Sequence, residues 1–291
     1  MLSLTLAALV PAIALCIFVF IKDRQEKEPI KLLILLFGAG ILTIIPSVIY
    51  ELLFEVILDS AFAGSITITE SSTACVTAAD YLYQFLNAFF GVALAEEFFK
   101  WVAMLLITKK SKHFNSLFDG IVYAVFVSLG FAALENVLYV FEGGIGVAIT
   151  RMLLSVPAHM FFGVFMGFYY SMWNLNRKSN LYKAQLMAKH NLTDDSRNPF
   201  PTKRFLALSL WIPVLVHGLY DFLLMTENIF CILVFIGFMI AMYIYCFKKI
   251  GKLSRSDRSD LELAKSAVFE KYPDLAAMEM PSESENSFAQ L

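Results

Sequence analysis

The sequence predicts an all-α protein, a polytopic bundle of about seven transmembrane helices. The first observation is composition: 58% of the 291 residues are hydrophobic and only 16% are charged, whereas soluble domains are about half apolar and a quarter charged. The second is that apolar residues occur in runs long enough to cross the ~30 Å hydrocarbon core of a bilayer. The third is an alternation of basic residues between successive loops, which is typical of multi-pass membrane proteins.

The apolar runs define the expected spans. A helix of about 17–25 residues crosses the hydrocarbon core, and such runs cover residues 2–21, 31–57, 80–108, 117–140, 147–173, 204–225 and 228–247. The first run lacks the basic start and the small-residue cleavage site of a signal peptide. We therefore expect it to remain as an anchored span.

Lysine and arginine accumulate in every second connection. Residues 58–79, 142–146 and 226–227 contain neither, whereas the other connections carry Lys22, Arg24, Lys27, Lys31, Lys109, Lys110, Lys112, Arg177, Lys178, Lys183, Lys189, Arg197, Lys203, Arg204, Lys248, Lys249 and Lys252. Because basic loops stay on the cytoplasmic side, the pattern predicts an N-terminus outside and a C-terminus in the cytoplasm.

The chain divides into a transmembrane domain, residues 1–249, and a cytoplasmic tail, residues 250–291. In the tail, apolar spacing predicts an amphipathic helix over 259–272. We expect Pro273 to end it, and the acidic, serine-rich residues 280–291 to be disordered. A short interfacial helix is expected over 181–190. Four cysteines without CxxC spacing predict neither a disulfide framework nor a thiolate metal site, and no nucleic-acid partner is expected.

Few ionisable residues lie inside the spans. They are Glu51 and Glu55 in the second, Glu96, Glu97 and Lys100 in the third, Glu135 in the fourth, His159 in the fifth, and His217 and Asp221 in the sixth. Charge at membrane depth costs about 2.5–3.5 kcal/mol per residue on insertion scales, so such residues are normally paired and functional. Glu51 and Glu55 lie near the end of their span and are interpreted as interfacial.

The helical rise places several of these residues in one layer. Measured from the cytoplasmic ends, Glu97, His159 and His217 come out at a depth of about 18–21 Å, and Glu135 and Asp221 at about 25–28 Å. Glu96 and Lys100 are four residues apart and can pair on one helix face, whereas Glu97 is turned about 100° away. Imidazole and carboxylate are ligands of zinc. A single histidine on an apolar helix is more often a hydrogen-bonded packing residue, but here two lie on separate helices.

Four motifs in order on successive spans resemble the PrsW family of membrane-embedded proteases. The matching segments are Glu96-Glu97-Phe98-Phe99-Lys100, Gly130-Phe131-Ala132-Ala133-Leu134-Glu135-Asn136, His159 with Gly163, and His217-Gly218-Leu219-Tyr220-Asp221. The stretch from Asp23 to Glu28-Pro29 also resembles the acidic segment that follows the first helix in that family. The chain has a more distant similarity to prenyl-protein endoproteases. It departs from their pattern at Lys100, Glu135 and Asp221, and these departures argue against a prenyl-protein substrate.

The resemblance implies peptide-bond hydrolysis in a bacterial cytoplasmic membrane. The implied substrate is a single-span membrane protein, such as an anti-sigma factor, cut near its extracytoplasmic side. Zn²⁺ would be held by His159 and His217, with Glu135 or Asp221 completing the ligand set. Glu97, with Glu96 as the second candidate, would be the general base, Lys100 would keep the neighbouring carboxylate ionised, and Asn136 would donate to the developing oxyanion.

Three alternatives remain open at this stage. A metal-free protease could use a glutamate to activate water and the histidines to hold the oxyanion. A proton- or cation-coupled transporter could also need charges inside its helices, although no inverted repeat is evident. A non-catalytic scaffold would be expected to lose Glu97 or a histidine, and the sequence retains them.

Overall fold

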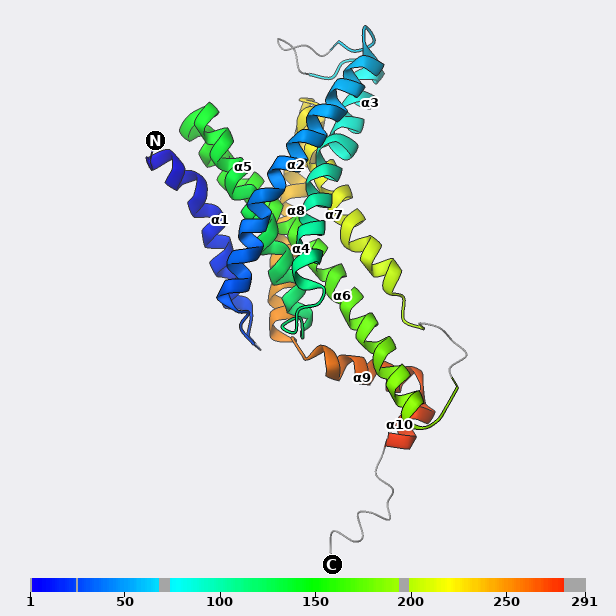
Figure 1. The fold of residues 1–291 in the computed structure, drawn as a ribbon. Helices are drawn as coiled ribbons and strands as arrows, with labels where there is room; N and C mark the ends of the chain where they lie inside the picture. Colours follow the sequence, from blue (N-terminus) through cyan, green and yellow to red (C-terminus); the bar gives the residue numbers. More distant parts are fainter. Residues whose placement is uncertain (1, 25, 68–73, 194–198, 280–291) are drawn as a thin grey trace, which may run out of the picture.

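In the computed structural model, every regular element of the described residues, 2–24, 26–67, 74–193 and 199–279, is helical. The elements are α1 (Leu2–Lys22), α2 (Ile30–Phe62), a continuous column of α3 (Ala78–Leu86), η1 (Asn87–Ala93) and α4 (Leu94–Thr108), then α5 (Leu117–Leu153), α6 (Ser155–Lys189), α7 (Thr202–Met225), α8 (Ile229–Arg255), α9 (Asp260–Lys271) and α10 (Pro273–Glu279) (Figure 1). The predicted all-α bundle is confirmed.

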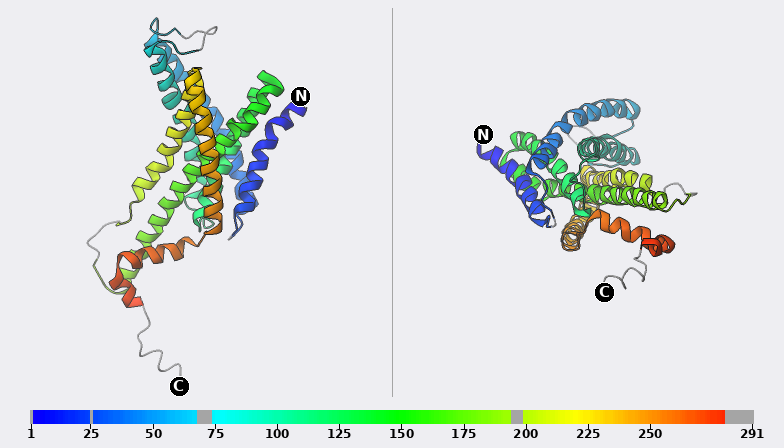
Figure 2. Two further views of the ribbon diagram at one scale, coloured as in Figure 1. Left: turned by 180° about the vertical axis from the view of Figure 1, so that it is seen from behind. Right: turned by 60° about the horizontal axis from the view of Figure 1, so that its bottom comes forward.

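The helices have the length and composition of membrane spans. Among the described residues, the stretches that qualify are Leu4–Lys22, Ile30–Phe62, Leu117–Lys189, Thr202–Met225 and Ile229–Arg255. The stretch Leu117–Lys189 contains both α5 and α6, and the column α3–η1–α4 covers the expected third span, residues 80–108. The start of α1 and the helices α9 and α10 lie at opposite ends of the bundle (Figures 1 and 2).

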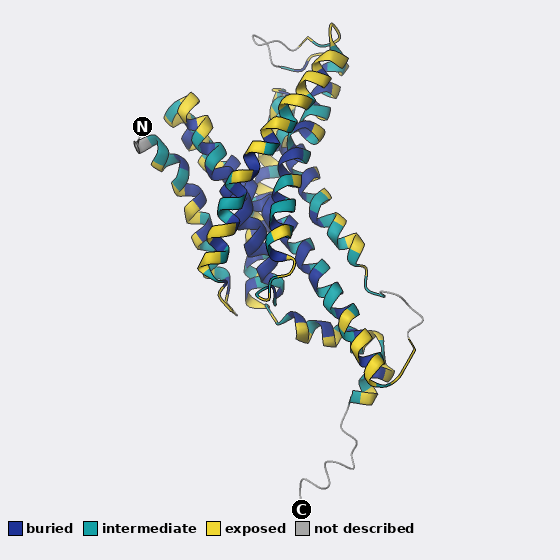
Figure 3. Ribbon diagram, in the orientation of Figure 1, coloured by how far each residue is buried: buried dark blue, intermediate teal, exposed yellow. Residues whose placement is uncertain are grey.

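Helix α5 is the centre of the bundle, and its residues 118–133 are buried on every side (Figure 3). Its helical geometry is interrupted at Gly144, which has a φ of 71°. Glycine tolerates this left-handed conformation without steric cost. The break lies inside the expected connection 142–146, and after it α6 packs against α5.

Helix α2 approaches α5 closely because glycines face each other's backbone. A Cβ atom at Gly40 would lie 2.0 Å from the carbonyl oxygen of Val127, and one at Gly130 would lie 2.1 Å from that of Phe37. Small residues at helix contacts are the usual way in which membrane helices pack backbone to backbone. This contact sets the distance between α2 and the part of α5 that carries Glu135.

The third span is a composite in which the π-helix η1 joins α3 to α4. The last residue of η1, Ala93, lies less than one helical turn before Glu96. Single π-helical turns inside longer helices occur frequently at functional sites. The irregular segment therefore lies next to the two glutamates.

At the cytoplasmic end, helix α6 runs without a break to Lys189 instead of giving a separate helix over 181–190, because residues 174–189 contain no glycine or proline. Helix α9 ends at Lys271, before Pro273, as expected, and Pro273 then begins α10, since proline is favoured at the first position of a helix. Helix α9 packs on α6 (Figures 1 and 2), and Leu186 of α6, Val268 of α9 and Leu275 of α10 form a small apolar cluster. Residues 280–291, predicted to be disordered, lie outside the described part of the chain.

Candidate active site

The ionisable residues that the sequence places at one depth meet around a cavity in the bundle. The cavity has a volume of about 570 Å³, within the range of about 300–1,000 Å³ that is usual for binding sites. Its lining includes Glu96, Glu135, His159, His217 and Asp221. Four helices, α4, α5, α6 and α7, thus direct these polar groups to one cavity.

The centre of the site is the side chain of Lys100. Its Nζ atom lies 2.9 Å from Glu96 Oε2 and 2.9 Å from Glu97 Oε1, and all three side chains are buried. The spacings of three and four residues put both carboxylates next to the lysine on α4. The expected pair of Glu96 and Lys100 is present, and Glu97 joins it. Removing charges from water is costly unless they are paired, and this triad provides the pairing.

The two glutamates differ in what they face. Glu96 lines the cavity, whereas Glu97 is fully buried behind it and does not appear in the lining. Glu97 Oε1 also lies 3.0 Å from His217 Nδ1. The other oxygen of Glu97, Oε2, is buried and has no hydrogen-bond partner among the residues that the structure describes.

The two histidines are arranged in the same way. Nδ1 of His159 lies 3.3 Å from Lys100 Nζ, so this atom faces the triad, as Nδ1 of His217 does. On the opposite edge, Nε2 of His159 lies 2.9 Å from Glu135 Oε2, and Nε2 of His217 lies 3.2 Å from Asp221 Oδ2. The ring centroids of the two histidines are 5.5 Å apart.

A carboxylate that binds the outer nitrogen of a histidine is the common arrangement around metal-binding histidines, where it fixes the ring and its tautomer. Glu135 and Asp221, which the sequence suggested as ligands, make contacts of this kind with the Nε2 atoms of the two histidines. Phe162 packs on the His217 ring at a centroid distance of 4.4 Å and an angle of 19°, which further restricts its orientation.

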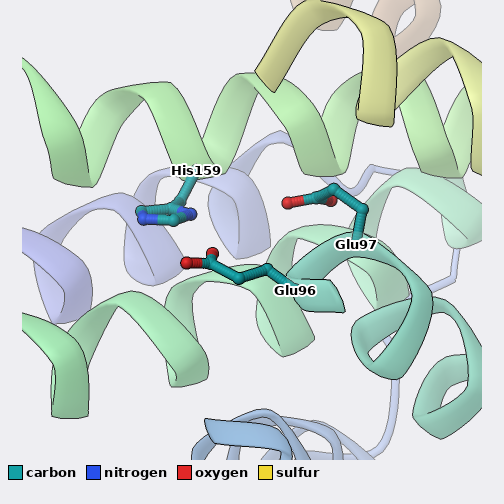
Figure 4. A group of neighbouring side chains, drawn as sticks. All are labelled: Glu96, Glu97 and His159. Atoms are coloured by element: carbon teal, nitrogen blue, oxygen red, sulfur yellow. The ribbon is translucent and has the colours of Figure 1, made fainter. Parts of the chain in front are cut away.

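The site contains donors that fit a single divalent ion. One ligand atom each from Glu96, Glu97 and His159 can be chosen so that all lie within 4.8 Å of one another, and the three side chains point toward one another (Figure 4). Imidazole and carboxylate are both zinc ligands. The buried Oε2 atom of Glu97, which has no partner within the described chain, is consistent with such an ion.

Asn136 is directed away from this cavity. Its Nδ2 donates to the backbone oxygen of Ala8 at 2.7 Å, and its Oδ1 accepts from Arg151 Nε at 3.0 Å. The amide therefore links α5 to α1, and Asn136 is not among the residues that line the cavity.

Three charged residues that line the cavity, Glu51, Glu142 and Arg151, were not among the site candidates from sequence. Glu51 of α2, interpreted as interfacial, lines the cavity, and so does Arg151. Arg151 forms a salt bridge of 2.7 Å with Glu135. In the sequence, Arg151 lies near the start of the expected span 147–173. It resembles an ordinary charged residue at the end of a span.

The fold and the site are those of a multi-pass membrane protein with an ionisable centre between its helices. These features place the protein in the class of membrane-embedded enzymes. A family model described as PrsW family intramembrane metalloprotease matches residues 28–247. The chain belongs to this family, and it is a protease of the bacterial membrane.

Curated relatives support the same assignment. Protease PrsW of Oceanobacillus iheyensis is 31% identical over 88% of this chain and 98% of its own length. Protease PrsW of Halalkalibacterium halodurans is 30% identical over 89% and 100%, and that of Bacillus subtilis is 32% identical over 77% and 84%. No solved structure matches the fold.

Proposed function

We propose that this protein is an intramembrane metalloendopeptidase that cleaves a single-span membrane protein near its extracytoplasmic side. The observation that carries the proposal is the set of buried donors on Glu96, Glu97 and His159, with ligand atoms within 4.8 Å of one another beside the cavity. An anti-sigma factor is the substrate class that the family resemblance implies.

Of this cluster we assign Glu97 and His159 to the metal, with His217, whose Nδ1 lies 3.0 Å from Glu97 Oε1, as the third ligand, and we keep Glu96 for the general base. Each histidine directs Nδ1 toward the triad, and Glu97 contacts one of them while its second oxygen is free. Zinc bound there would supply Lewis-acid activation of a water molecule and of the scissile carbonyl. Glu135 and Asp221 act as the carboxylates that orient the histidines.

Glu96 is the general base in this proposal, because it lines the cavity and Glu97 does not. Its carboxylate accepts the proton of the attacking water and returns it to the leaving amide nitrogen, as a positioned general base does. Lys100 is the counter-charge of Glu96, with Nζ 2.9 Å from Oε2. Because Asn136 donates to Ala8, the structure offers no support for the oxyanion role suggested by its motif.

One observation favours a second candidate, a metal-free protease. Lys100 Nζ contacts Glu96, Glu97 and His159 at 2.9, 2.9 and 3.3 Å, so an ammonium group already neutralises the carboxylates. In that case Glu96 activates water directly and a histidine holds the developing oxyanion, an electrostatic role that preorganised donors commonly perform.

The test is the metal content of the protein purified in detergent, together with cleavage of a single-span substrate in proteoliposomes. We expect about one zinc per chain in the wild type and loss of zinc and cleavage in His159→Ala and His217→Ala. His190→Ala, on the cytoplasmic side next to Glu279, is the control and should keep both. Metal-free protein that cleaves would select the second candidate, and metal-free protein without cleavage would refute both.

A further inference from the structure

Arg151 is the single lysine or arginine among the described residues that line the cavity. It lies in the last part of α5, after the break at Gly144. Its side chain is only 15% exposed, and no part of the mechanism above uses it. A buried charge in a membrane protein is costly and usually has a function.

The guanidinium group is held on three sides by residues of α5. One Nη2 contact to Glu135 Oε2 measures 2.7 Å, Nε donates to Asn136 Oδ1 at 3.0 Å, and the group lies 4.1 Å from the centroid of the Tyr139 ring. The planar, multiply donating group of arginine suits such fixed geometry, which lysine cannot reproduce. Arg151 therefore fixes the position of the Glu135 carboxylate.

The oxygen that Arg151 contacts is the one that faces His159. Glu135 Oε2 lies 2.9 Å from His159 Nε2. An ionised carboxylate can only accept a hydrogen bond, so the proton of the imidazole resides on Nε2. On the other edge of the ring, Nδ1 lies 3.3 Å from Lys100 Nζ. An ammonium group has no acceptor, so Nδ1 must be unprotonated. Both contacts require the same tautomer.

We propose that Arg151 is a positioning residue that acts through Glu135 to keep the His159 proton on Nε2, so that the lone pair of Nδ1 points at the catalytic centre. The inference rests on the proposed function in one respect, namely that Nδ1 of His159 faces the groups that carry out the cleavage. Arg151 neutralises Glu135 and prevents this carboxylate from turning away from the imidazole. Loss of such an outer partner typically costs 10–100-fold in metal affinity or activity.

The first measurement is the tautomer of His159 in metal-free protein. The chain has four histidines, so selective ¹⁵N labelling and the variant His159→Ala assign its two ring nitrogens by NMR. We expect the proton on Nε2 in the wild type, and a mixed tautomer in Arg151→Gln, in which Lys100 alone still favours Nε2. Arg177→Gln is the matched control, because Arg177 also stacks on an aromatic ring, Trp173, and donates to an asparagine, Asn174.

The second measurement is kinetic. Arg151→Gln should lower kcat by about 10–100-fold with little change in KM, and Arg151→Lys should restore part of kcat by returning the charge. An Nε2-protonated His159 in folded Arg151→Gln would overturn the proposal. If Arg151→Gln does not fold, Glu135→Gln carries the same test, since an amide can rotate to donate to Nε2, and an unchanged tautomer there would equally overturn it.

The outcomes separate this inference from the proposed function. A tautomer that depends on Arg151 in a protein that neither binds zinc nor cleaves a substrate would support the positioning role and refute the protease mechanism. A cleaving wild type whose His159 tautomer does not depend on Arg151 would do the reverse.

Discussion

His217 Nδ1 lies 3.0 Å from Glu97 Oε1, and this contact joins α7 to α4 across the middle of the site. Neither side chain is more than 4% exposed. A polar contact of this kind inside the bundle is far stronger than it would be in water. It fixes one wall of the cavity and places the second imidazole next to the carboxylate pair.

The different surroundings of Glu96 and Glu97 predict different effects of replacing each by glutamine. Glu96→Gln should lower kcat by about 10²–10⁴-fold, the usual contribution of a general base, and leave the zinc content unchanged. Glu97→Gln should lower both activity and zinc content, because Glu97 contacts His217 and its Oε2 atom has no hydrogen-bond partner within the described residues. Cleavage assays and metal analysis on the same preparations measure both quantities.

The control for this pair is Glu55→Gln, an exposed position of α2 outside the cavity lining. It should behave as the wild type. Full activity in Glu96→Gln would contradict its assignment as the base, and zinc retained in Glu97→Gln would remove this residue from the ligand set.

Lys100→Met leaves two buried carboxylates without their counter-charge. Breaking a buried ion pair on one side costs about 3–5 kcal/mol, so we expect a loss of this size in the free energy of unfolding, along with loss of cleavage. Denaturant unfolding in detergent measures the stability. Lys109→Met, at an exposed lysine directly after α4, serves as the control. A loss below about 1 kcal/mol would mean that the triad does not need the ammonium group.

Much of this architecture follows from the sequence because membrane constraints are simple. Span length fixes the helices, and helical rise puts Glu97, His159 and His217 at one depth; the structure brings these three residues together. The break between the fourth and fifth spans was expected at 142–146 and occurs at Gly144.

Depth along a helix does not reveal the direction in which a side chain points, and the site departs from prediction for this reason. Asn136 follows Glu135 directly, yet it turns toward Ala8 of α1. Glu51 looked like an end residue but faces the cavity. The role of Glu135 beside His159 depends on Arg151, which reaches it from 16 residues further along α5.

The approach of α2 to α5 predicts that even one methyl group at Gly130 is harmful. A Cβ there would lie 2.1 Å from the backbone oxygen of Phe37, so the helices must separate. Overpacking of this kind costs about 1–3 kcal/mol, and we expect Gly130→Ala to lower both the unfolding temperature and cleavage, because α5 carries Glu135. Gly237→Ala is the control, since a Cβ at Gly237 meets nothing within 4 Å. Equal stability of the two variants would refute the close contact.

The buried carboxyl group of Glu28, in the cytoplasmic loop between α1 and α2, predicts a pH-dependent stability. Burial and the neighbouring Asp119 carboxylate raise the pKa of Glu28 to about 8 from an ordinary value of 4.5. Its Oε2 atom has no hydrogen-bond partner within the described chain. The folded protein therefore binds this proton more tightly than the unfolded chain does.

The sign of the effect follows from proton linkage. The contribution of Glu28 to stability is fully present below about pH 4.5 and is lost progressively as the pH rises to about 8. Glu28→Gln, which stays neutral, should show a flatter dependence of the unfolding temperature on pH and should exceed the wild type above pH 8. Glu26→Gln, at an exposed neighbour that accepts from Asn115, should follow the wild-type curve. Parallel curves for the wild type and Glu28→Gln would show that Glu28 does not retain its proton in the folded protein.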